Sequence, residues 1–398
     1  MPRNTRSWWR LSAVLLALSL IAAACGNDDD GASGGEEDSG GGDKQTVALA
    51  YVGPKTGDAA NLGIFILNGA KVAVKQANEK SDKFNFVLKE FDTQGDPAQA
   101  PGQAAKYIAD QEIVGVVGPA FSGESKAVLK NLQEANLVMV SASATASDIP
   151  GTVPGQTVFH RVLPDDAAQA AGIAKYLKAK QAGKSVAYVH DNQDYSKGLA
   201  DAVAKAATAN GHRNLGTFTV DKNSQDFSAA VNSVKGAKPD IVFYGGYYAE
   251  AGRLKKQLSD AGVTALFMSG DGALDQGFLK GAGSGPNNSI ISCPCNLATE
   301  AAGGRIGTFA KDYKAEHGSE PGTYSSEAFD AANILIEGIE AGNTTREKLL
   351  AHVEGLPAYD GISKKIEFVE NGNLSLTTVY FFQVKDGEFA PLTTTDDF

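Results

Sequence analysis

The chain has 398 residues and a formal net charge of −11 at pH 7. That length is too great for one compact core and is typical of two lobes with separate cores. The chain is acidic and has no basic stripe, so we expect no nucleic-acid partner.

The N-terminus has the pattern of an export signal. Three arginines precede an apolar run, Leu11–Leu20, which is too short for a comfortable membrane-spanning helix. Small residues then lead directly to Cys25, as in the lipobox of bacterial lipoproteins. We therefore expect a lipoprotein signal peptide over residues 1–24 and lipidation of Cys25. The alternative is an ordinary signal peptide cleaved near Ala24.

A flexible tether is expected after the signal peptide. Residues 26–44 are mainly glycine, serine and acidic residues, with no large apolar side chain that could build a core. We expect lipidated Cys25 and this tether, residues 25–44, to hold a globular domain at the extracytoplasmic face of a cell membrane.

Strands and helices alternate from Val47 onward, which predicts an α/β fold. Strands are expected at 47–52, 84–91, 113–117, 137–140, 185–190, 216–220, 240–244, 265–268, 289–292, 366–368 and 377–384. Helices are expected at 62–79, 97–110, 166–180, 195–210, 224–236, 249–261, 325–341 and 345–353, and one opens at Ser122. This alternation predicts two doubly wound parallel-sheet lobes joined by a multi-strand hinge. The expected lobes are residues 45–161 with 294–375, and residues 162–293 with 376–398.

Two turns of small and hydroxyl-bearing residues follow consecutive strands of the first lobe. Ser122 opens a helix after the third strand, and Ser143 and Thr145 follow the fourth. Ligands of α/β sheets bind at the carboxyl ends of such strands. Unpaired N–H groups at a helix start also favour an anion such as a carboxylate. These turns therefore predict a small-molecule anion site.

The second lobe supplies an acid and aromatic side chains after three of its strands. Tyr195, Tyr247 and Asp271 each follow a strand. Together with the first-lobe turns they match a zwitterion with an apolar side chain. Its ammonium would pair with Asp271 and be partly caged by tyrosine faces. Core or surface packing is the alternative role for each tyrosine taken alone.

No catalytic constellation emerges from the sequence. Gly183–Ser185 imitates the end of a phosphate-binding loop but lacks its first glycine and precedes a strand. The five histidines are scattered without metal-ligand spacing. Cys293 and Cys295 form either a small strained disulfide or two thiols, and two ligands alone make a poor zinc site. We expect no enzyme activity, cofactor or metal.

Several segments resemble, in the same order, the substrate-binding proteins of branched-chain amino acid ABC transporters. This Leu/Ile/Val-binding protein family has the type I periplasmic-binding-protein fold. The matching segments are 139–145, 188–200, 226–228 and 243–250. The resemblance implies that the following residues bind the ligand: Leu62, Ser122, Ser143 (through its backbone), Ala144, Thr145, Tyr195, Tyr247, Asp271 and Tyr324. Relatives often have Glu at the position of Asp271 and Tyr at that of Leu62, so the wall at Leu62 is more apolar here.

The resemblance also implies a mechanism. The lobes would close over an amino acid, branched-chain or otherwise neutral, and the closed protein would deliver it to the permease subunits of an ABC transporter. We expect a monomer. Two alternatives remain: the same fold binding a short amide, urea or an aromatic acid, and a ligand-sensing receptor.

Overall fold

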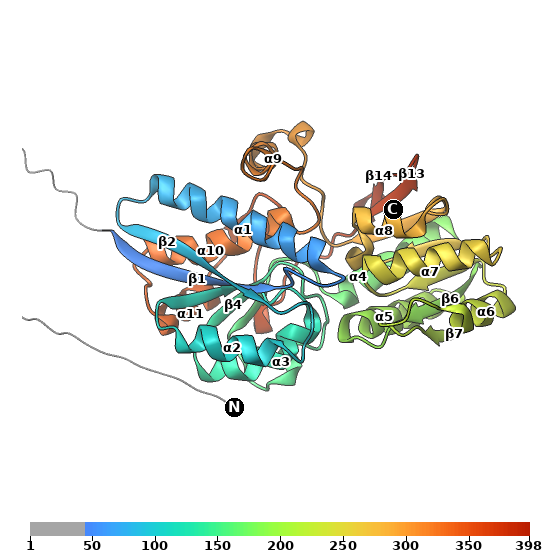
Figure 1. Cartoon of the computed structure of the whole chain (residues 1–398), viewed down its shortest axis with the longest axis horizontal. Helices are drawn as coiled ribbons and strands as arrows, with labels where there is room; N and C mark the ends of the chain where they lie inside the picture. Colours follow the sequence, from blue (N-terminus) through green and yellow to red (C-terminus); the bar gives the residue numbers. More distant parts are fainter. Residues whose placement is uncertain (1–43) are drawn as a thin grey trace, which may run out of the picture. The chain divides into compact units, whose positions relative to one another are not determined.

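Two separate β-sheets organise the computed structural model, which describes residues 44–398 (Figure 1). The expected signal peptide, Cys25 and all of the tether before Lys44 lie outside the described residues. The prediction of an α/β fold with parallel-sheet lobes is confirmed.

The first sheet is parallel, with strand order β2-β1-β3-β4-β5. Its strands are β1 (Gln45–Gly53), β2 (Phe84–Asp92), β3 (Ile113–Val117), β4 (Val138–Ser141) and β5 (Phe159–Arg161). The helices of this part are α1 (Ala60–Lys80), α2 (Ala100–Ala109), α3 (Ser122–Glu134), α9 (Gly304–His317), α10 (Ser325–Glu340) and α11 (Arg346–Glu354). A small hairpin, β11 (Tyr359–Asp360) with β12 (Lys365–Ile366), follows α11. We call this part lobe 1.

The second sheet has the strand order β14-β13-β10-β9-β8-β6-β7. Its parallel strands are β6 (Ser185–His190), β7 (Arg213–Thr219), β8 (Ile241–Tyr244), β9 (Leu266–Ser269) and β10 (Ser289–Cys293). Two antiparallel strands complete it, β13 (Tyr380–Lys385) and β14 (Glu388–Thr394). Its helices are α4 (Asp166–Lys180), α5 (Asp194–Ala209), α6 (Ser228–Ala237), α7 (Tyr248–Asp260) and α8 (Gln276–Ala282). We call this part lobe 2.

Five short 3₁₀ helices lie between these elements. They are η1 (Pro150–Thr152), η2 (Asp271–Ala273), η3 (Glu300–Ala302), η4 (Glu370–Gly372) and η5 (Thr395–Asp397). Only η2 carries an expected ligand-binding residue, Asp271.

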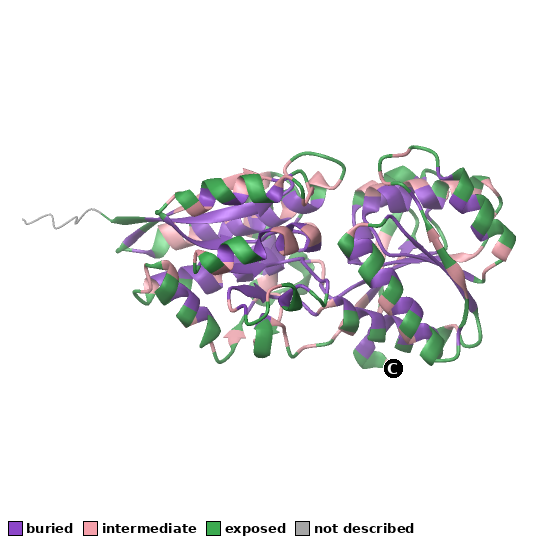
Figure 2. Cartoon of the chain, turned by 90° about the horizontal axis from the view of Figure 1, so that it is seen from below, coloured by how far each residue is buried: buried purple, intermediate pink, exposed green. Residues whose placement is uncertain are grey.

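Burial explains why the strands were readable from the sequence. All residues of β3, β4 and β6 are buried, and buried parallel strands appear as continuous apolar runs. Figure 2 shows buried strands between helices whose outer faces are exposed. Most helices thus cover a sheet with one face and meet water with the other, whereas α10 is buried almost throughout.

Several details of the expected elements are wrong. Helices α8 and α9 and strands β5, β11 and β14 were not expected, and the strand expected at 366–368 is only the two-residue β12. Strand β14 contains Pro391 and lies at the sheet edge, where a missing N–H costs no ladder bond. Helix α9 begins at Gly304 and is preceded by Gly303, and both glycines have positive φ. Only four residues of this helix are buried. Such a narrow apolar face gives little periodic signal.

The chain passes between the lobes near the expected boundaries. The boundary after residue 161 coincides with the end of β5, and the one after Cys293 with the end of β10. The third, after residue 375, precedes β13. The exact division into lobes stays a prediction. A disulfide joins Cys293 to Cys295 at the second crossing, which is one of the two states expected for these cysteines.

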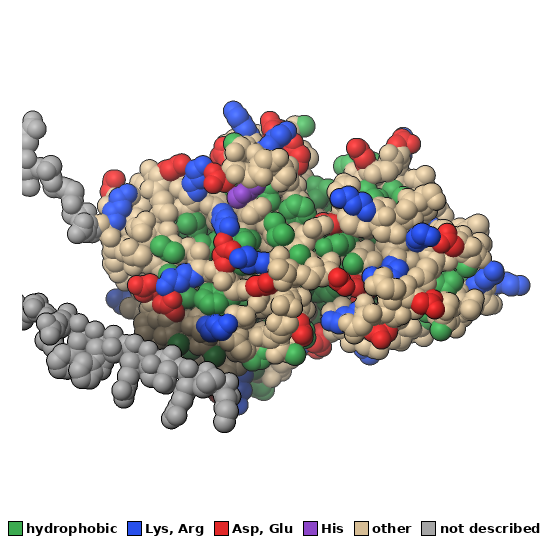
Figure 3. All heavy atoms as spheres, viewed as in Figure 1, with side chains coloured by type: hydrophobic (Ala, Val, Ile, Leu, Met, Phe, Trp, Pro, Cys, Tyr) green, Lys and Arg blue, Asp and Glu red, His purple; other side chains and the backbone are tan. Residues whose placement is uncertain are grey.

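Acidic and basic side chains are interspersed over the face drawn in Figure 3, without a basic stripe. Within residues 44–398, no helix combines the length and the apolar character needed to cross a membrane.

Candidate functional site

The first site turn is fixed by a buried glutamate at the start of α3. The Glu124 carboxylate accepts the Phe121 N–H, with 2.8 Å between N and Oε2, and also the Thr93 hydroxyl. A glutamate at this position of a helix stabilises the helix start by accepting the backbone N–H that precedes it. Ser122, the first residue of α3, is 1% exposed, and its Oγ accepts the Ala146 N–H at 3.1 Å. The two predicted turns of lobe 1 are therefore held together.

The second site turn offers backbone groups and one hydroxyl. The Ser143 hydroxyl donates to the Ala120 carbonyl, so this side chain is already bonded within lobe 1, and a ligand contact through the Ser143 backbone stays a prediction. The Ala144 N–H is taken up by the Ser141 hydroxyl at 3.0 Å. The Thr145 hydroxyl is fully buried, forms no hydrogen bond of normal geometry with the described residues, and lies close enough to the Asp166 carboxyl to lower its pKa. Because an unpaired buried polar group costs about 1–3 kcal/mol, Thr145 is well suited to meet a ligand.

The acid and the tyrosines of the prediction meet in one buried cluster. Asp271 is 1% exposed. Its Oδ1 accepts the Tyr195 hydroxyl at 2.8 Å, and its Oδ2 accepts the Tyr324 hydroxyl. Burial raises the pKa of Asp271, and the two tyrosine bonds act in the opposite direction. Asp271 is thus a desolvated carboxyl held in place by two phenols.

Glycines on both sides of Asp271 allow the tyrosines to approach. A Cβ on Gly272 would lie 2.8 Å from Cε1 of Tyr195 and 3.0 Å from Cδ1 of Tyr247. A Cβ on Gly270 would lie 2.9 Å from the Tyr195 hydroxyl oxygen. Real side chains avoid such distances, so the Gly-Asp-Gly sequence is what lets the aromatic rings pack against this acid.

A second buried carboxyl, Asp166, was missed by the sequence reasoning. It opens α4, is 2% exposed, and neither of its carboxyl oxygens has a hydrogen-bond partner among residues 44–398. Burial, and then the charge of nearby Asp271, raise the pKa of Asp166 well above its usual range. Two carboxyls in one desolvated place favour a cation between them.

Asp166 was not predicted because an acid at the start of a helix is usually explained by helix capping. Two consecutive acids, Asp165 and Asp166, open α4, and acids are common in the first turn of any helix. In the structure Asp165 is the cap, since its Oδ1 accepts the Ala168 N–H at 2.9 Å. Because Asp165 already caps the helix, the Asp166 carboxyl is available for another role.

The two halves of the site meet directly where the Tyr324 hydroxyl of lobe 1 donates to Asp271 of lobe 2, and they also meet along two further routes. On one, Thr145 accepts the Asp166 N–H through its carbonyl at 2.8 Å, and Asp166 lies near Asp271. On the other, the Phe121 ring lies 4.5 Å from the Tyr247 ring, and Tyr247 lies 5.0 Å from Tyr195, measured between centroids. The structure therefore brings the lobe 1 turns to the lobe 2 acid and tyrosines. Phe121 was not among the predicted residues.

Leu62 lies fully buried in the first turn of α1, but its place in a ligand wall stays a prediction.

The neighbour of Leu62, Asn61, forms hydrogen bonds to lobe 2. The Asn61 Nδ2 donates to Asp275 Oδ1 at 3.0 Å, and its N–H donates to the Tyr248 hydroxyl at 3.3 Å. The start of α1 is thus tied across the cleft.

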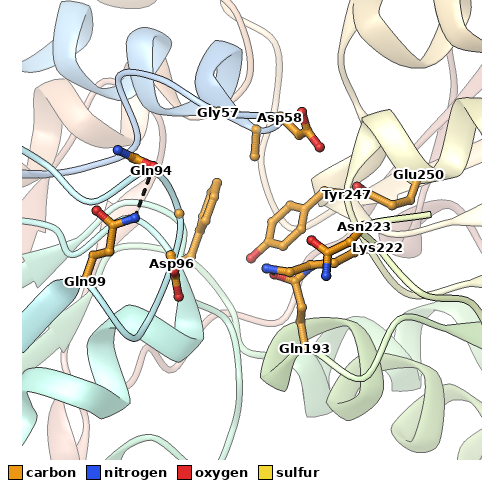
Figure 4. A pocket seen from close by; sticks show the side chains of 13 residues that line it. Gly57, Asp58, Gln94, Asp96, Gln99, Gln193, Lys222, Asn223, Tyr247 and Glu250 are labelled. Atoms are coloured by element: carbon orange, nitrogen blue, oxygen red, sulfur yellow. Dashed lines mark hydrogen bonds between the residues drawn. The ribbon is translucent and has the colours of Figure 1, made fainter. Parts of the chain in front are cut away.

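Two cavities of about 280 and 260 Å³ adjoin this site (Figure 4). Both are lined by Phe121 and Tyr247 and by polar side chains of the two lobes, whereas Asp271 and Thr145 line neither.

Over residues 44–398 there is no cluster of three or more side chains suited to a metal ion. The geometry offers donors, acids and aromatic faces for binding a zwitterion.

Comparisons with known proteins agree with this geometry. A model described as periplasmic binding protein matches residues 46–388. The chain is 31% identical to a Leu/Ile/Val-binding protein homolog of Brucella melitensis, over 87% of this chain and 93% of that protein.

Two solved structures also share the fold. A leucine binding protein of Thermotoga maritima, 26% identical, has a TM-score of 0.80 and covers 88% of this chain and 100% of its own. A solute binding protein of R. palustris in complex with benzoate, 17% identical, has a TM-score of 0.79 and covers 88% and 96%. The family is one of solute-binding proteins rather than of enzymes. The chain therefore belongs to the periplasmic binding protein family, in the group that contains the Leu/Ile/Val-binding proteins.

Proposed function

We propose that the protein is an extracytoplasmic solute-binding lipoprotein. It captures a branched-chain or other neutral amino acid between its lobes and delivers it to an ABC transporter permease. One observation carries the proposal: two buried carboxyls, Asp166 and Asp271, lie near each other, and the backbone of Asp166 is bonded to the hydroxyl-rich turn of lobe 1 at Thr145. The relatives named as Leu/Ile/Val-binding and leucine binding proteins support it.

The proposed ligand is held at both of its charged ends. Its ammonium lies between Asp166 and Asp271, and its carboxylate takes donors of lobe 1. These donors are the hydroxyls of Ser122 and Thr145, together with the backbone N–H groups of Ser143 and Ala144, which would exchange their bonds to the Ser141 hydroxyl for the ligand. The side chain rests against Leu62, Tyr195, Tyr247 and Tyr324. A zwitterion satisfies groups that otherwise lie buried without partners, including the Thr145 hydroxyl and the Asp166 oxygens.

Contacts across the cleft support closure around the ligand. Lys126 of α3 pairs with Asp194 of α5 at 3.1 Å while also pairing with Asp148 of its own lobe at 2.8 Å. Such contacts form only when the lobes approach each other. In this proposal the closed monomer, anchored through lipid on Cys25, is the form that the permease subunits recognise.

The second candidate is another small ligand on the same fold. The relative in complex with benzoate and the aromatic walls of this site favour an aromatic acid. An aromatic acid, however, has no cation to place between Asp166 and Asp271, so it leaves two buried carboxyls unpaired. The same argument counts against urea and short amides. A ligand-sensing receptor would use the same binding chemistry.

Calorimetric titration of the purified chain tests the proposal. Leucine, isoleucine and valine should bind, whereas benzoate, urea and acetamide should not. Asp271→Asn should cost about 2–5 kcal/mol, at least about thirty-fold in Kd, because the ammonium loses a buried charge partner.

The same exchange at an exposed acid of lobe 2, Asp260→Asn, is the control and should leave Kd unchanged. Retention of leucine affinity in Asp271→Asn, or tight binding of benzoate by the unaltered chain, would contradict the proposal.

A further inference from the structure

We infer that Phe121 and Tyr247 form an aromatic gate between the lobes that limits the length of the ligand side chain. The gate separates the buried amino acid site from a polar chamber outside it. This inference rests on the proposed function, since it concerns which amino acids the same site accepts.

The gate is a direct ring contact across the cleft. Phe121 precedes α3 in lobe 1, Tyr247 precedes α7 in lobe 2, and their ring centroids are 4.5 Å apart. The two residues are 4% and 8% exposed. At that separation the rings touch, so no side chain passes between them while the lobes are closed.

Both partners are held in position from behind. Tyr247 packs on Tyr195, whose hydroxyl holds Asp271. Phe121 is fixed by its N–H bond to buried Glu124, and its ring lies against Gly95, where a Cβ would be 3.1 Å from Cε2. The gate is therefore built on the same groups that position the charged ends of the ligand.

The chamber outside the gate has a different character from the buried site. Gln94 and Asp96 of lobe 1 face Gln193, Lys222 and Asn223 of lobe 2 across it, as Figure 4 shows. Lys222 forms no ion pair with any described residue. Its side chain forms one hydrogen bond within residues 44–398, to Gln193 Oε1, and this bond is long at 3.4 Å. Amide and ammonium groups of this kind suit the polar end of a longer side chain.

The gate thus decides between two classes of ligand. With the rings in contact, the buried site accepts a short aliphatic side chain held against tyrosines. With the Phe121 ring removed, the site and the polar chamber become continuous. A longer side chain that ends in an amide, as in glutamine, then reaches the polar groups, and a large ring, as in phenylalanine, gains room.

Titrations of the full chain with leucine, phenylalanine and glutamine test the gate. Phe121→Ala should improve the affinities for phenylalanine and glutamine, relative to that for leucine, at least tenfold. The control is Phe91→Ala, which truncates an aromatic pair (Phe91 with Tyr107) that lies within lobe 1 alone. It should leave the three relative affinities unchanged. Ratios within about twofold of the unaltered chain in Phe121→Ala would overturn the gate.

A second measurement follows the ring contact itself rather than ligand selectivity. Trp8 and Trp9 are the only tryptophans of the chain, so a chain with both changed to phenylalanine and with Phe121→Trp carries one fluorescent probe, in the gate. Adding Tyr247→Ala should raise acrylamide quenching of that probe at least twofold at saturating leucine, where the lobes are closed. Unchanged quenching in the leucine-saturated variant would overturn the gate. Failure of the unaltered chain to bind any amino acid would instead refute the proposed function.

Discussion

At the scale of single residues, the site is defined by groups whose burial is unfavourable until a ligand arrives. Asp166 has no hydrogen-bond partner for either carboxyl oxygen among residues 44–398, and Thr145 has none for its hydroxyl. Asp271 is better satisfied, because Tyr195 and Tyr324 donate to it. We therefore assign Asp166 an equal share in holding the ammonium, although family resemblance pointed only to Asp271.

The raised pKa values of Asp166 and Asp271 predict proton release on binding. An ammonium favours the ionised carboxyls and lowers their pKa, so protons leave and affinity falls as the pH drops below the raised values. Calorimetry at one pH in buffers of different ionisation enthalpy measures this release, which Asp166→Asn should reduce. A binding enthalpy independent of the buffer throughout the range from about pH 5 to 8 would contradict this account.

A site residue could be predicted from the sequence only where no ordinary structural role explained it equally well. Ser122, Thr145, Tyr195, Tyr247 and Asp271 directly follow strands, and the geometry of a parallel sheet brings such positions together. Asp166 could not be distinguished from a helix-capping acid. Phe121 could not be distinguished from a core aromatic, because its importance lies in a contact with the other lobe.

At the scale of elements, the buried strands were the most predictable feature and the surface elements the least. Strand β4 is fully buried and apolar except for its last residue, Ser141, whereas α9 and the edge strand β14 are largely exposed. Hydrogen bonds between elements far apart in the chain could not be predicted, because they leave no pattern in the sequence around either residue. The bond from Asn61 at the start of α1 to Asp275 before α8 spans 214 residues of sequence.

The hydrogen bond from Asn61 at the start of α1 to Asp275 gives a prediction at the scale of elements. Asp275 is 4% exposed and accepts from Asn61, so Asn61→Ala leaves a buried carboxyl with one donor fewer in the closed form. Leucine affinity should fall roughly five- to thirty-fold, mainly through faster dissociation, because about 1–2 kcal/mol of closed-state stabilisation is lost. Stopped-flow dissociation measures this change.

Asn85→Ala is the matched control for Asn61→Ala, since Asn85 bonds only to Thr46 at the exposed start of the sheet. It should leave the dissociation rate unchanged. An equal effect in both variants would show that the α1 tie has no special part in closure.

At the scale of the whole molecule, each lobe supplies half of a site that neither could form alone. Lobe 1 contributes N–H and hydroxyl donors at the ends of β3 and β4, and lobe 2 contributes acids and tyrosines at the ends of β6, β8 and β9. The charged ends of an amino acid match these two halves. Recognition of the zwitterion is thus the central claim, and side-chain selection is secondary.

Titration with leucine and its two half-blocked analogues tests that claim most directly. 4-Methylpentanoate keeps the carboxylate and side chain but lacks the ammonium, and leucinamide keeps the ammonium but lacks the carboxylate. We predict one-to-one binding of leucine and at least about a hundredfold weaker binding of both analogues, because each leaves buried charged or polar groups unpaired. Binding of either analogue with the affinity of leucine would contradict the account.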